Sequence, residues 1–243
     1  MKLVERWYSD CVHRHVTVAR WGEFGTPALV FPTAGGDAEE IERMGLVDAA
    51  SPLLGAGRIK LYSCDSLAGD AMLRGEGSGG FRAALLKAYH ELVRYEVLPA
   101  IRADCNTPEI TMITAGASIG AFNALAMLCR FPDVTSAAVC MSGTYDIARF
   151  VGAVSSEDLY FATPLYFLNG LNGEQLAMLR RRFVILASGE GAWEDIGESW
   201  RMADLLGRKG IPNRVDAWGS AFEHDWPTWR SMLPQYLAEL TGG

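Results

Sequence analysis

The chain has 243 residues, 49% of them hydrophobic, and a formal net charge of −7. This length suits one large domain with a substantial core and is short for two, so we expect a single domain over residues 1–243. The acidic balance and the lack of a long basic run argue against a nucleic acid or an anionic membrane surface as a partner.

The five cysteines are scattered without a C-x-x-C pair, which predicts neither a disulfide framework nor a zinc site. The four histidines lack a metal-ligand spacing, so we expect no metal and no organic cofactor. Charges follow Met1 where a signal peptide has its apolar stretch, and no apolar run reaches the length of a membrane span. We therefore expect a cytoplasmic protein that acts on a small molecule. The sequence is compatible with either a monomer or a homo-oligomer.

Strand and helix patterns alternate along the chain. The expected strands are residues 4–9, 12–21, 28–32, 58–64, 110–115, 135–141, 183–187 and 214–218. The expected helices are residues 38–50, 81–103, 121–130, 199–209 and 228–240, and residues 67–80 are expected to form a loop. This alternation predicts an α/β fold in which a mostly parallel central sheet has helices on both faces and the leading strands pair antiparallel at one edge.

Residues 147–182 interrupt this rhythm after the sixth strand. They contain aromatic runs at 159–161 and 164–168, followed by a helix rich in Leu and Met. We expect a short cap-like excursion that covers a substrate pocket. Its aromatic side chains would either bind part of the substrate or form core beneath the loop.

The sequence Gly116-Ala-Ser118-Ile-Gly120 matches the nucleophile-elbow pattern G-x-S-x-G, and it stands between an expected strand and an expected helix. A nucleophile on such a tight turn has a strained backbone, and glycines allow the strand and the helix to approach closely. The N–H groups at the start of the helix would point to where negative charge develops during acyl transfer. Ser118 is therefore the candidate nucleophile.

The small-residue loop over residues 33–37 follows the strand that we expect beside the nucleophile strand. Such a loop is well placed to offer backbone N–H groups to an oxyanion. An ordinary glycine-rich turn is the alternative interpretation.

A serine nucleophile needs a base within hydrogen-bond reach. His13 and His15 lie in the N-terminal strand region, and His90 lies inside a helix, where a satisfied packing or surface residue is the more frequent case. His224 alone follows the last strand in a loop. We expect His224 to be the base.

The acid that orients the base should follow the seventh strand. Glu194 is preferred because the neighbouring Trp193 could shield its carboxylate from water, with Asp195 and then Glu190 as alternatives and Asp146 behind them. The resulting chain order of serine, acid and histidine is the order found in α/β-hydrolases.

Three segments carry a resemblance to a known family: residues 31–36 (Phe-Pro-Thr-Ala-Gly-Gly), 116–121 (Gly-Ala-Ser-Ile-Gly-Ala) and 224–230 (His-Asp-Trp-Pro-Thr-Trp-Arg). With them the chain resembles the esterase-D-like family of the α/β-hydrolase superfamily, which has H-x-W-x-x-W-R at the last segment. The resemblance implies an α/β-hydrolase fold with Ser118 as nucleophile and His224 as base.

The same resemblance implies oxyanion donors at the backbone N–H of Ile119 and in the region of Thr33 and Ala34. Ala192 stands where the family usually carries its acidic residue. The resulting hypothesis is a serine carboxylic-ester hydrolase that forms an acyl-enzyme on Ser118. An acyltransferase that uses the same residues and a non-catalytic binding scaffold are the alternatives.

Overall fold

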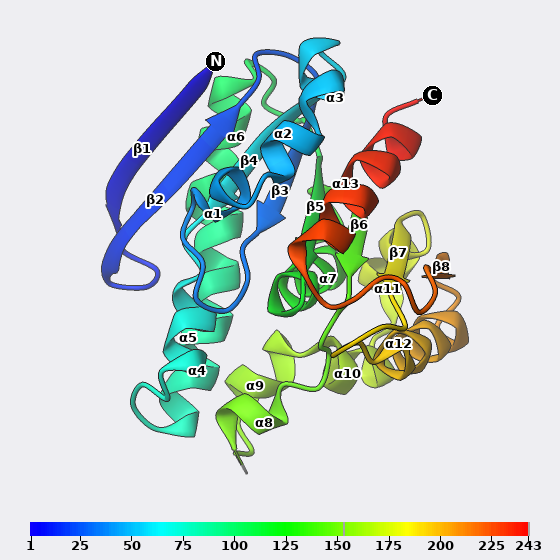
Figure 1. Ribbon diagram of the computed structural model, residues 1–243. Coiled ribbons are helices and arrows are strands. Elements are labelled where there is room, and N and C mark those ends of the chain that lie inside the picture. Colours follow the sequence, from blue (N-terminus) through cyan, green and yellow to red (C-terminus); the bar gives the residue numbers. More distant parts are fainter. Residues whose placement is uncertain (153, 243) are drawn as a thin grey trace.

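The computed structural model describes residues 1–152 and 154–242, and strands and helices alternate along it (Figure 1). The strands are β1 (Lys2–Ser9), β2 (Arg14–Trp21), β3 (Thr26–Phe31), β4 (Ile59–Cys64), β5 (Met112–Ala117), β6 (Thr135–Met141), β7 (Phe183–Ser188) and β8 (Asn213–Ala217). They form one sheet in the order β1-β2-β4-β3-β5-β6-β7-β8. The pairs β1–β2 and β2–β4 are antiparallel and the others are parallel, as expected for leading strands at one edge.

The helices are α1 (Glu40–Arg43), α2 (Leu46–Ala49), α3 (Ser51–Gly55), α4 (Leu67–Leu73), α5 (Gly79–Leu92), α6 (Leu98–Asp104), α7 (Ile119–Arg130), α8 (Ala148–Val151), α9 (Glu157–Ala162), α10 (Pro164–Phe167), α11 (Gly173–Leu179), α12 (Ile196–Arg208) and α13 (Trp226–Leu240). Within the described residues, none is long and apolar enough to cross a membrane.

The sheet has a hydrophobic core on each face because successive side chains of a strand point to opposite sides. In β3, Leu29 and Phe31 pack with α4–α7 and α12, whereas Ala28 and Val30 pack with α1–α3 and α13. Figure 1 shows these two helical layers around the sheet. The all-apolar strand pattern therefore correctly predicted a sheet covered on both faces.

Two expected helices differ in detail. The helix expected at residues 38–50 is divided into short helices, because Gly45 has a positive φ of 78° that no regular helix contains. The long helix expected at residues 81–103 consists of α5 and α6, joined by a π-helical turn at Val93–Val97. Pro99 follows this turn, and its ring nitrogen cannot donate the hydrogen bond of a regular helix.

The expectation of a loop over residues 67–80 is partly wrong, because α4 occupies Leu67–Leu73. Gly69 resembled a loop residue in the sequence, but it lies in this helix where the chain passes close to Ala34. A Cβ atom at Gly69 would lie 2.9 Å from the carbonyl oxygen of Ala34. The glycine is required for close packing of α4 under the small-residue loop.

The excursion after β6 forms α8–α11 (Figure 1). It starts at the carboxyl end of β6, but α11 packs at the C-terminal end of α7, where Gln175 Nε2 donates to the carbonyls of Cys129 and Arg130 at 3.1 Å. Three of its aromatic side chains, Tyr160, Phe161 and Phe167, line a cavity of about 330 Å³ with Arg130 and Phe131. Ser118 does not line this cavity. A separate pocket beside Ser118 is lined by Ala148 and Arg149 of α8.

Candidate active site

Ser118 occupies a sharp turn between β5, which ends at Ala117, and α7, which begins at Ile119. Its backbone has φ 56° and ψ −120°, a conformation that is strained for a residue with a side chain. The turn is held from the next strand, since the Ser118 N–H donates to the carbonyl of Met141 at 3.0 Å. This is the geometry that presents a nucleophile at the carboxyl end of a sheet.

The two glycines of the elbow are required by the packing around them. A Cβ atom at Gly116 would lie 2.4 Å from the carbonyl carbon of Gly120. A Cβ atom at Gly120 would lie 2.5 Å from the carbonyl oxygen of Phe31 and 2.8 Å from that of Pro32. Real Cβ atoms do not approach this closely, so α7 can lie against β5 and β3 only because both residues are glycines.

The expected oxyanion donors differ in their freedom to bind a ligand. Ile119 is the first residue of α7, where helical N–H groups have no partner in a preceding turn. The Thr33 N–H is already committed to Oε2 of Glu40 at 2.8 Å, and its hydroxyl donates to Oε1 at 2.7 Å. Within residues 1–152 and 154–242, the Ala34 N–H donates to no protein group, which makes Ala34 the freer donor of this loop.

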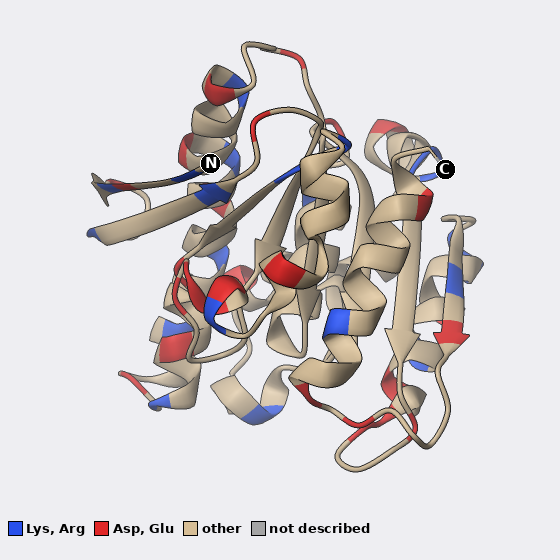
Figure 2. Cartoon of the chain, turned by 45° about the horizontal axis from the view of Figure 1, so that its top comes forward, with Lys and Arg blue, Asp and Glu red and all other residues tan. Residues whose placement is uncertain are grey.

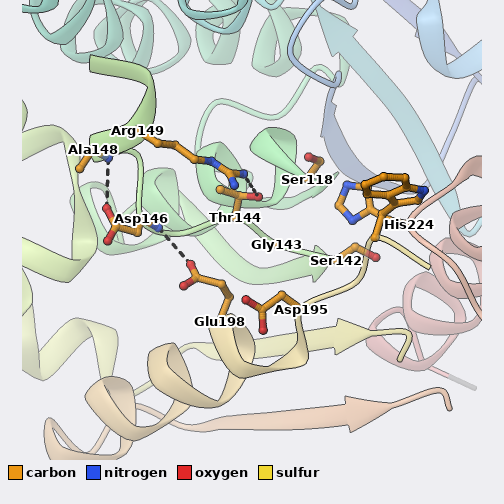
Figure 3. A pocket seen from close by; sticks show the side chains of 11 residues that line it. Ser118, Ser142, Gly143, Thr144, Asp146, Ala148, Arg149, Asp195, Glu198 and His224 are labelled. Carbon is orange, nitrogen blue, oxygen red and sulfur yellow. Dashed lines mark hydrogen bonds between the residues drawn. The ribbon is translucent and has the colours of Figure 1, made fainter. Parts of the chain in front are cut away.

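A pocket of about 360 Å³ opens beside Ser118 at the carboxyl end of the sheet (Figure 3). Its lining combines Ser118, Ser142, Gly143, Thr144, Asp146, Ala148, Arg149, Trp193, Asp195, Glu198 and His224. The turns after β5 and β6, the loops before α12 and α13, and the first residues of α8 and α12 supply this lining from parts far apart in the sequence. The candidate nucleophile and the candidate base therefore face one cavity.

His224 and Glu194 are in contact, with Nδ1 of the imidazole 3.4 Å from Oε2 of the carboxylate. The His224 side chain is 23% exposed, whereas that of Glu194 is only 1% exposed. The backbone N–H of His224 also donates to the carbonyl of Ala192 at 3.0 Å. The position that lacks the usual acidic side chain thus still anchors the histidine loop through its backbone.

The Glu194 carboxylate is buried but well satisfied. Oε1 accepts hydrogen bonds from Ser142 Oγ at 2.5 Å and from the Gly189 N–H at 3.2 Å. Burial by itself would raise the pKa of Glu194, but the hydrogen bonds from His224 and Ser142 outweigh it and hold this pKa below its usual range. Glu194 is therefore ionised at neutral pH and able to stabilise a positive charge on His224.

Trp229 contacts both His224 and Ser142, the residue that donates to the Glu194 carboxylate. Its ring packs edge to face on His224, with the ring centroids 5.2 Å apart, and its Nε1–H donates to Ser142 Oγ at 2.9 Å. Trp226 packs on Trp229 in turn, at 5.0 Å between centroids. The H-x-W-x-x-W spacing thus places Trp229 beside the histidine ring and Trp226 against Trp229.

Ser142 is one of the residues of this site that the sequence analysis missed. It follows the carboxyl end of β6, is 3% exposed and has a positive φ of 48°. Its N–H donates to the carbonyl of Ala187 at 2.7 Å, which fixes the turn against β7. Position after a strand end was the available signal, and a serine there has no motif that distinguishes it from a turn residue.

The other candidate acids are placed differently. Asp195 lines the pocket but caps α12, where its Oδ1 accepts the Gly197 N–H at 3.0 Å. Asp146 lies across the pocket beside Arg201, and Glu190 has an exposed side chain. The shielding role expected for Trp193 is wrong: its backbone has a positive φ of 65° and its side chain is 89% exposed at the pocket. The carboxylate is covered instead by Ser142, which Trp229 contacts in turn.

The remaining histidines lie away from Ser118. His90 is fully buried in α5, where its Nε2 lies 3.0 Å from Oδ1 of Asn123, and His13 and His15 belong to the β1–β2 hairpin. Across the described residues, no three potential metal ligands are grouped as a metal site would require.

Comparison with known proteins agrees with this architecture. Residues 82–240 match the model of the family described as "Putative esterase". No curated protein sequence matches the chain. The match covers more than half of the chain, which therefore belongs to this esterase family and to the class of carboxylic ester hydrolases with an α/β-hydrolase fold.

Solved structures share the fold at low sequence identity. A ferulic acid esterase is 17% identical with a TM-score of 0.77, over 99% of this chain and 97% of that one. The fluorophosphonate-binding serine hydrolase F (FphF) of Staphylococcus aureus is 12% identical with a TM-score of 0.70, over 100% and 99% of the two chains. MPT51 (FbpC1) of Mycobacterium tuberculosis is 16% identical with a TM-score of 0.69, over 98% of each chain.

Proposed function

We propose that the protein hydrolyses a small carboxylic ester through an acyl-enzyme on Ser118, with His224 as general base and Glu194 as the acid that orients it. The observation that carries this proposal is the strained elbow at Ser118, which shares one pocket with a histidine whose Nδ1 faces a buried, satisfied carboxylate. A binding scaffold has no need of a buried carboxylate that contacts a half-buried imidazole in this way.

In the acylation step, the Ser118 Oγ attacks the ester carbonyl while Nε2 of His224 takes the hydroxyl proton. The ionised Glu194 accepts the hydrogen bond from Nδ1–H, so it selects the tautomer whose Nε2 is free and stabilises the imidazolium. His224 then gives its proton to the leaving alcohol oxygen as the C–O bond breaks.

The tetrahedral oxyanion would be held by the Ile119 N–H, at the positive end of the twelve-residue helix α7, and by the Ala34 N–H. Thr33 would act by shaping this loop, since its N–H and hydroxyl bind Glu40. Water then attacks the acyl-enzyme with His224 again as base, which releases the acid and restores Ser118.

The test is the intact mass of the protein after incubation with a fluorophosphonate, followed by peptide mapping and by turnover of p-nitrophenyl acetate. We expect one adduct on Ser118, and neither adduct nor turnover in a folded Ser118→Ala variant. Ser231→Ala, which removes an exposed hydroxyl on α13, should label and turn over like the wild type. Wild-type turnover by Ser118→Ala would refute the proposal.

Product analysis with an added alcohol distinguishes hydrolysis from transfer on the same acyl-enzyme. Release of the free acid as the main product supports the hydrolase, whereas preferential formation of a new ester would identify an acyltransferase.

A further inference from the structure

The charged side chains that line the Ser118 pocket are unequal in their availability to a substrate. Besides His224, the lining contains the carboxylates of Asp146, Asp195 and Glu198 and a single cation, Arg149. Figure 2 shows acidic residues in the loop before α13 and in the neighbouring loops as well. Net charge alone would suggest a pocket for cations, but the partners of each group lead to a different conclusion.

Glu198 is engaged by the protein itself. Its Oε2 accepts the backbone N–H groups of Tyr145 at 3.0 Å and of Asp146 at 3.1 Å. Its Oε1 lies 3.7 Å from the guanidinium of Arg201. This carboxylate holds the turn after β6 and has little remaining capacity for a ligand.

The other two carboxylates are also engaged. Oδ1 of Asp146 accepts the Ala148 N–H at 3.1 Å, and its Oδ2 lies 3.5 Å from Arg201. Asp195 caps α12, whose N-terminus favours a negative charge.

Arg149 has no such partner. From the described residues, no carboxylate lies within 4 Å of its guanidinium, and the one hydrogen bond it donates goes from Nη2 to Thr144 Oγ1 at 3.1 Å. The guanidinium carbon lies 4.8 Å from the centre of the Phe150 ring, a cation–π contact that leaves its N–H donors free. A guanidinium has five N–H donors, so most of its capacity is unused.

Arg149 is connected to Ser118 through the intervening residue Thr144. Its side chain extends from α8 toward the Ser118 side of the pocket and ends beside Thr144 (Figure 3). The backbone N–H of Thr144 in turn lies 3.4 Å from the carbonyl oxygen of Ser118. An anion bound by Arg149 would therefore belong to the same small molecule as an ester placed at Ser118.

We infer that Arg149 binds a carboxylate on the substrate, so that the enzyme prefers esters carrying a carboxylate near the ester bond over neutral esters of the same size. This inference rests on the proposed function of Ser118. A guanidinium matches a carboxylate with paired N–H donors. The three nearby carboxylates disfavour a doubly charged phosphate more than a singly charged carboxylate, because repulsion scales with charge.

Two matched substrate pairs test the inference and show which side of the ester carries the anion. The pair 4-acetoxybenzoate and methyl 4-acetoxybenzoate places the carboxylate or its neutral ester on the leaving group. The pair monomethyl glutarate and methyl pentanoate places it on the acyl group. The readout is the ratio of kcat/KM for the anionic ester to that for its neutral partner.

We expect Arg149→Gln to lower this ratio about tenfold or more for one pair, the usual scale for losing a charge-assisted hydrogen-bonded pair. Arg181→Gln removes the same charge from an exposed position between α11 and β7 and should leave the ratio unchanged. Equal ratios in the wild type and in Arg149→Gln, for both pairs, would overturn the inference.

A binding measurement separates this inference from the chemistry of Ser118. In a Ser118→Ala background, calorimetry with 4-acetoxybenzoate and with monomethyl glutarate should detect binding of one anion that Arg149→Gln weakens about tenfold. Arg149-dependent binding in a protein that shows neither fluorophosphonate labelling of Ser118 nor turnover of p-nitrophenyl acetate would refute the proposed function and still support the Arg149 subsite. Binding equal with and without Arg149 would refute the subsite.

Discussion

Ser142 donates a hydrogen bond of 2.5 Å from its Oγ to Oε1 of Glu194. The hydroxyl can keep this direction because Trp229 Nε1–H occupies its acceptor side at 2.9 Å. The two bonds form a chain in which an indole orients a hydroxyl, the hydroxyl orients a carboxylate, and the carboxylate faces His224. Ser142 and Trp229 are therefore positioning residues for the proposed acid.

We predict that Ser142→Ala lowers kcat about tenfold to a hundredfold and changes KM little, because a hydrogen bond to a buried charge is lost while the substrate pocket keeps its shape. Trp229→Phe should have a smaller effect of the same kind, because it keeps a ring beside His224 and removes only the donor. Steady-state kinetics of the single and double variants test this. The double variant should lose less than the product of the two single effects, since both act through one carboxylate.

Trp226→Phe is the matched control, because this indole packs on Trp229 and donates no hydrogen bond to Ser142. Its kcat should stay near the wild-type value. Independent, fully multiplying effects of Ser142→Ala and Trp229→Phe would contradict the chain of hydrogen bonds.

The choice among the acids has a direct kinetic test. Glu194→Gln should lower kcat about 10³- to 10⁴-fold, as expected when a buried triad acid no longer selects the productive tautomer. Asp195→Asn and Glu190→Gln should stay within about tenfold of the wild type, because a helix cap and an exposed side chain do not touch His224. A larger loss in Asp195→Asn than in Glu194→Gln would reassign the acid.

The surroundings of Gly120 at the elbow and of Gly207 in α12 predict opposite effects of an alanine substitution on stability. Gly120→Ala should destabilise the protein by about 2 kcal/mol or more, because its Cβ would lie 2.5 Å from the backbone oxygen of Phe31. Gly207→Ala in α12 should stabilise it by about 0.5–1 kcal/mol, since the added methyl group meets nothing within 4 Å. Urea unfolding measures both, and equal stability of the two variants would contradict the packing argument.

His90 predicts a pH dependence of stability. Burial lowers its pKa from 6.5 to about 3, so the folded protein binds no proton there at a pH at which the unfolded chain does. Stability therefore falls as the pH drops from 6.5 toward 3, by about 1.4 kcal/mol per pH unit from this residue. Unfolding of wild type and of His90→Gln between pH 6.5 and pH 4.5 isolates this contribution. Parallel stability profiles for the two proteins would show that His90 does not titrate as described.

Patterns in the sequence were sufficient for the sheet and for the elbow because both depend on local chemistry. All-apolar strands predict burial on both faces, and G-x-S-x-G predicts close packing of a strand and a helix. The acid was harder to predict from the sequence, because the loop after β7 has three carboxylates at similar positions. Glu194 was favoured for a reason that is wrong, since Trp193 is exposed and the carboxylate is covered by Ser142 in the turn after β6, which Trp229 contacts in turn.

Ser142 and Arg149 could not be singled out in the same way. Their importance depends on which partners other segments leave free, and this is a property of the folded contacts rather than of spacing. Glu40 shows the same limit in the small-residue loop, where a side chain from α1 takes up the Thr33 N–H.

The hydrogen bond between Ser142 and Glu194 joins residues 52 positions apart, and the whole excursion of residues 147–182 lies between them. The insertion leaves the sheet at the carboxyl end of β6 and rejoins it at the amino end of β7, whereas the bond joins the carboxyl ends of these two parallel strands. Segments of other lengths could therefore replace the insertion while this bond keeps the carboxylate in place. In such a fold, the part of the pocket that carries Arg149 can change without changes to the groups proposed to break the ester bond.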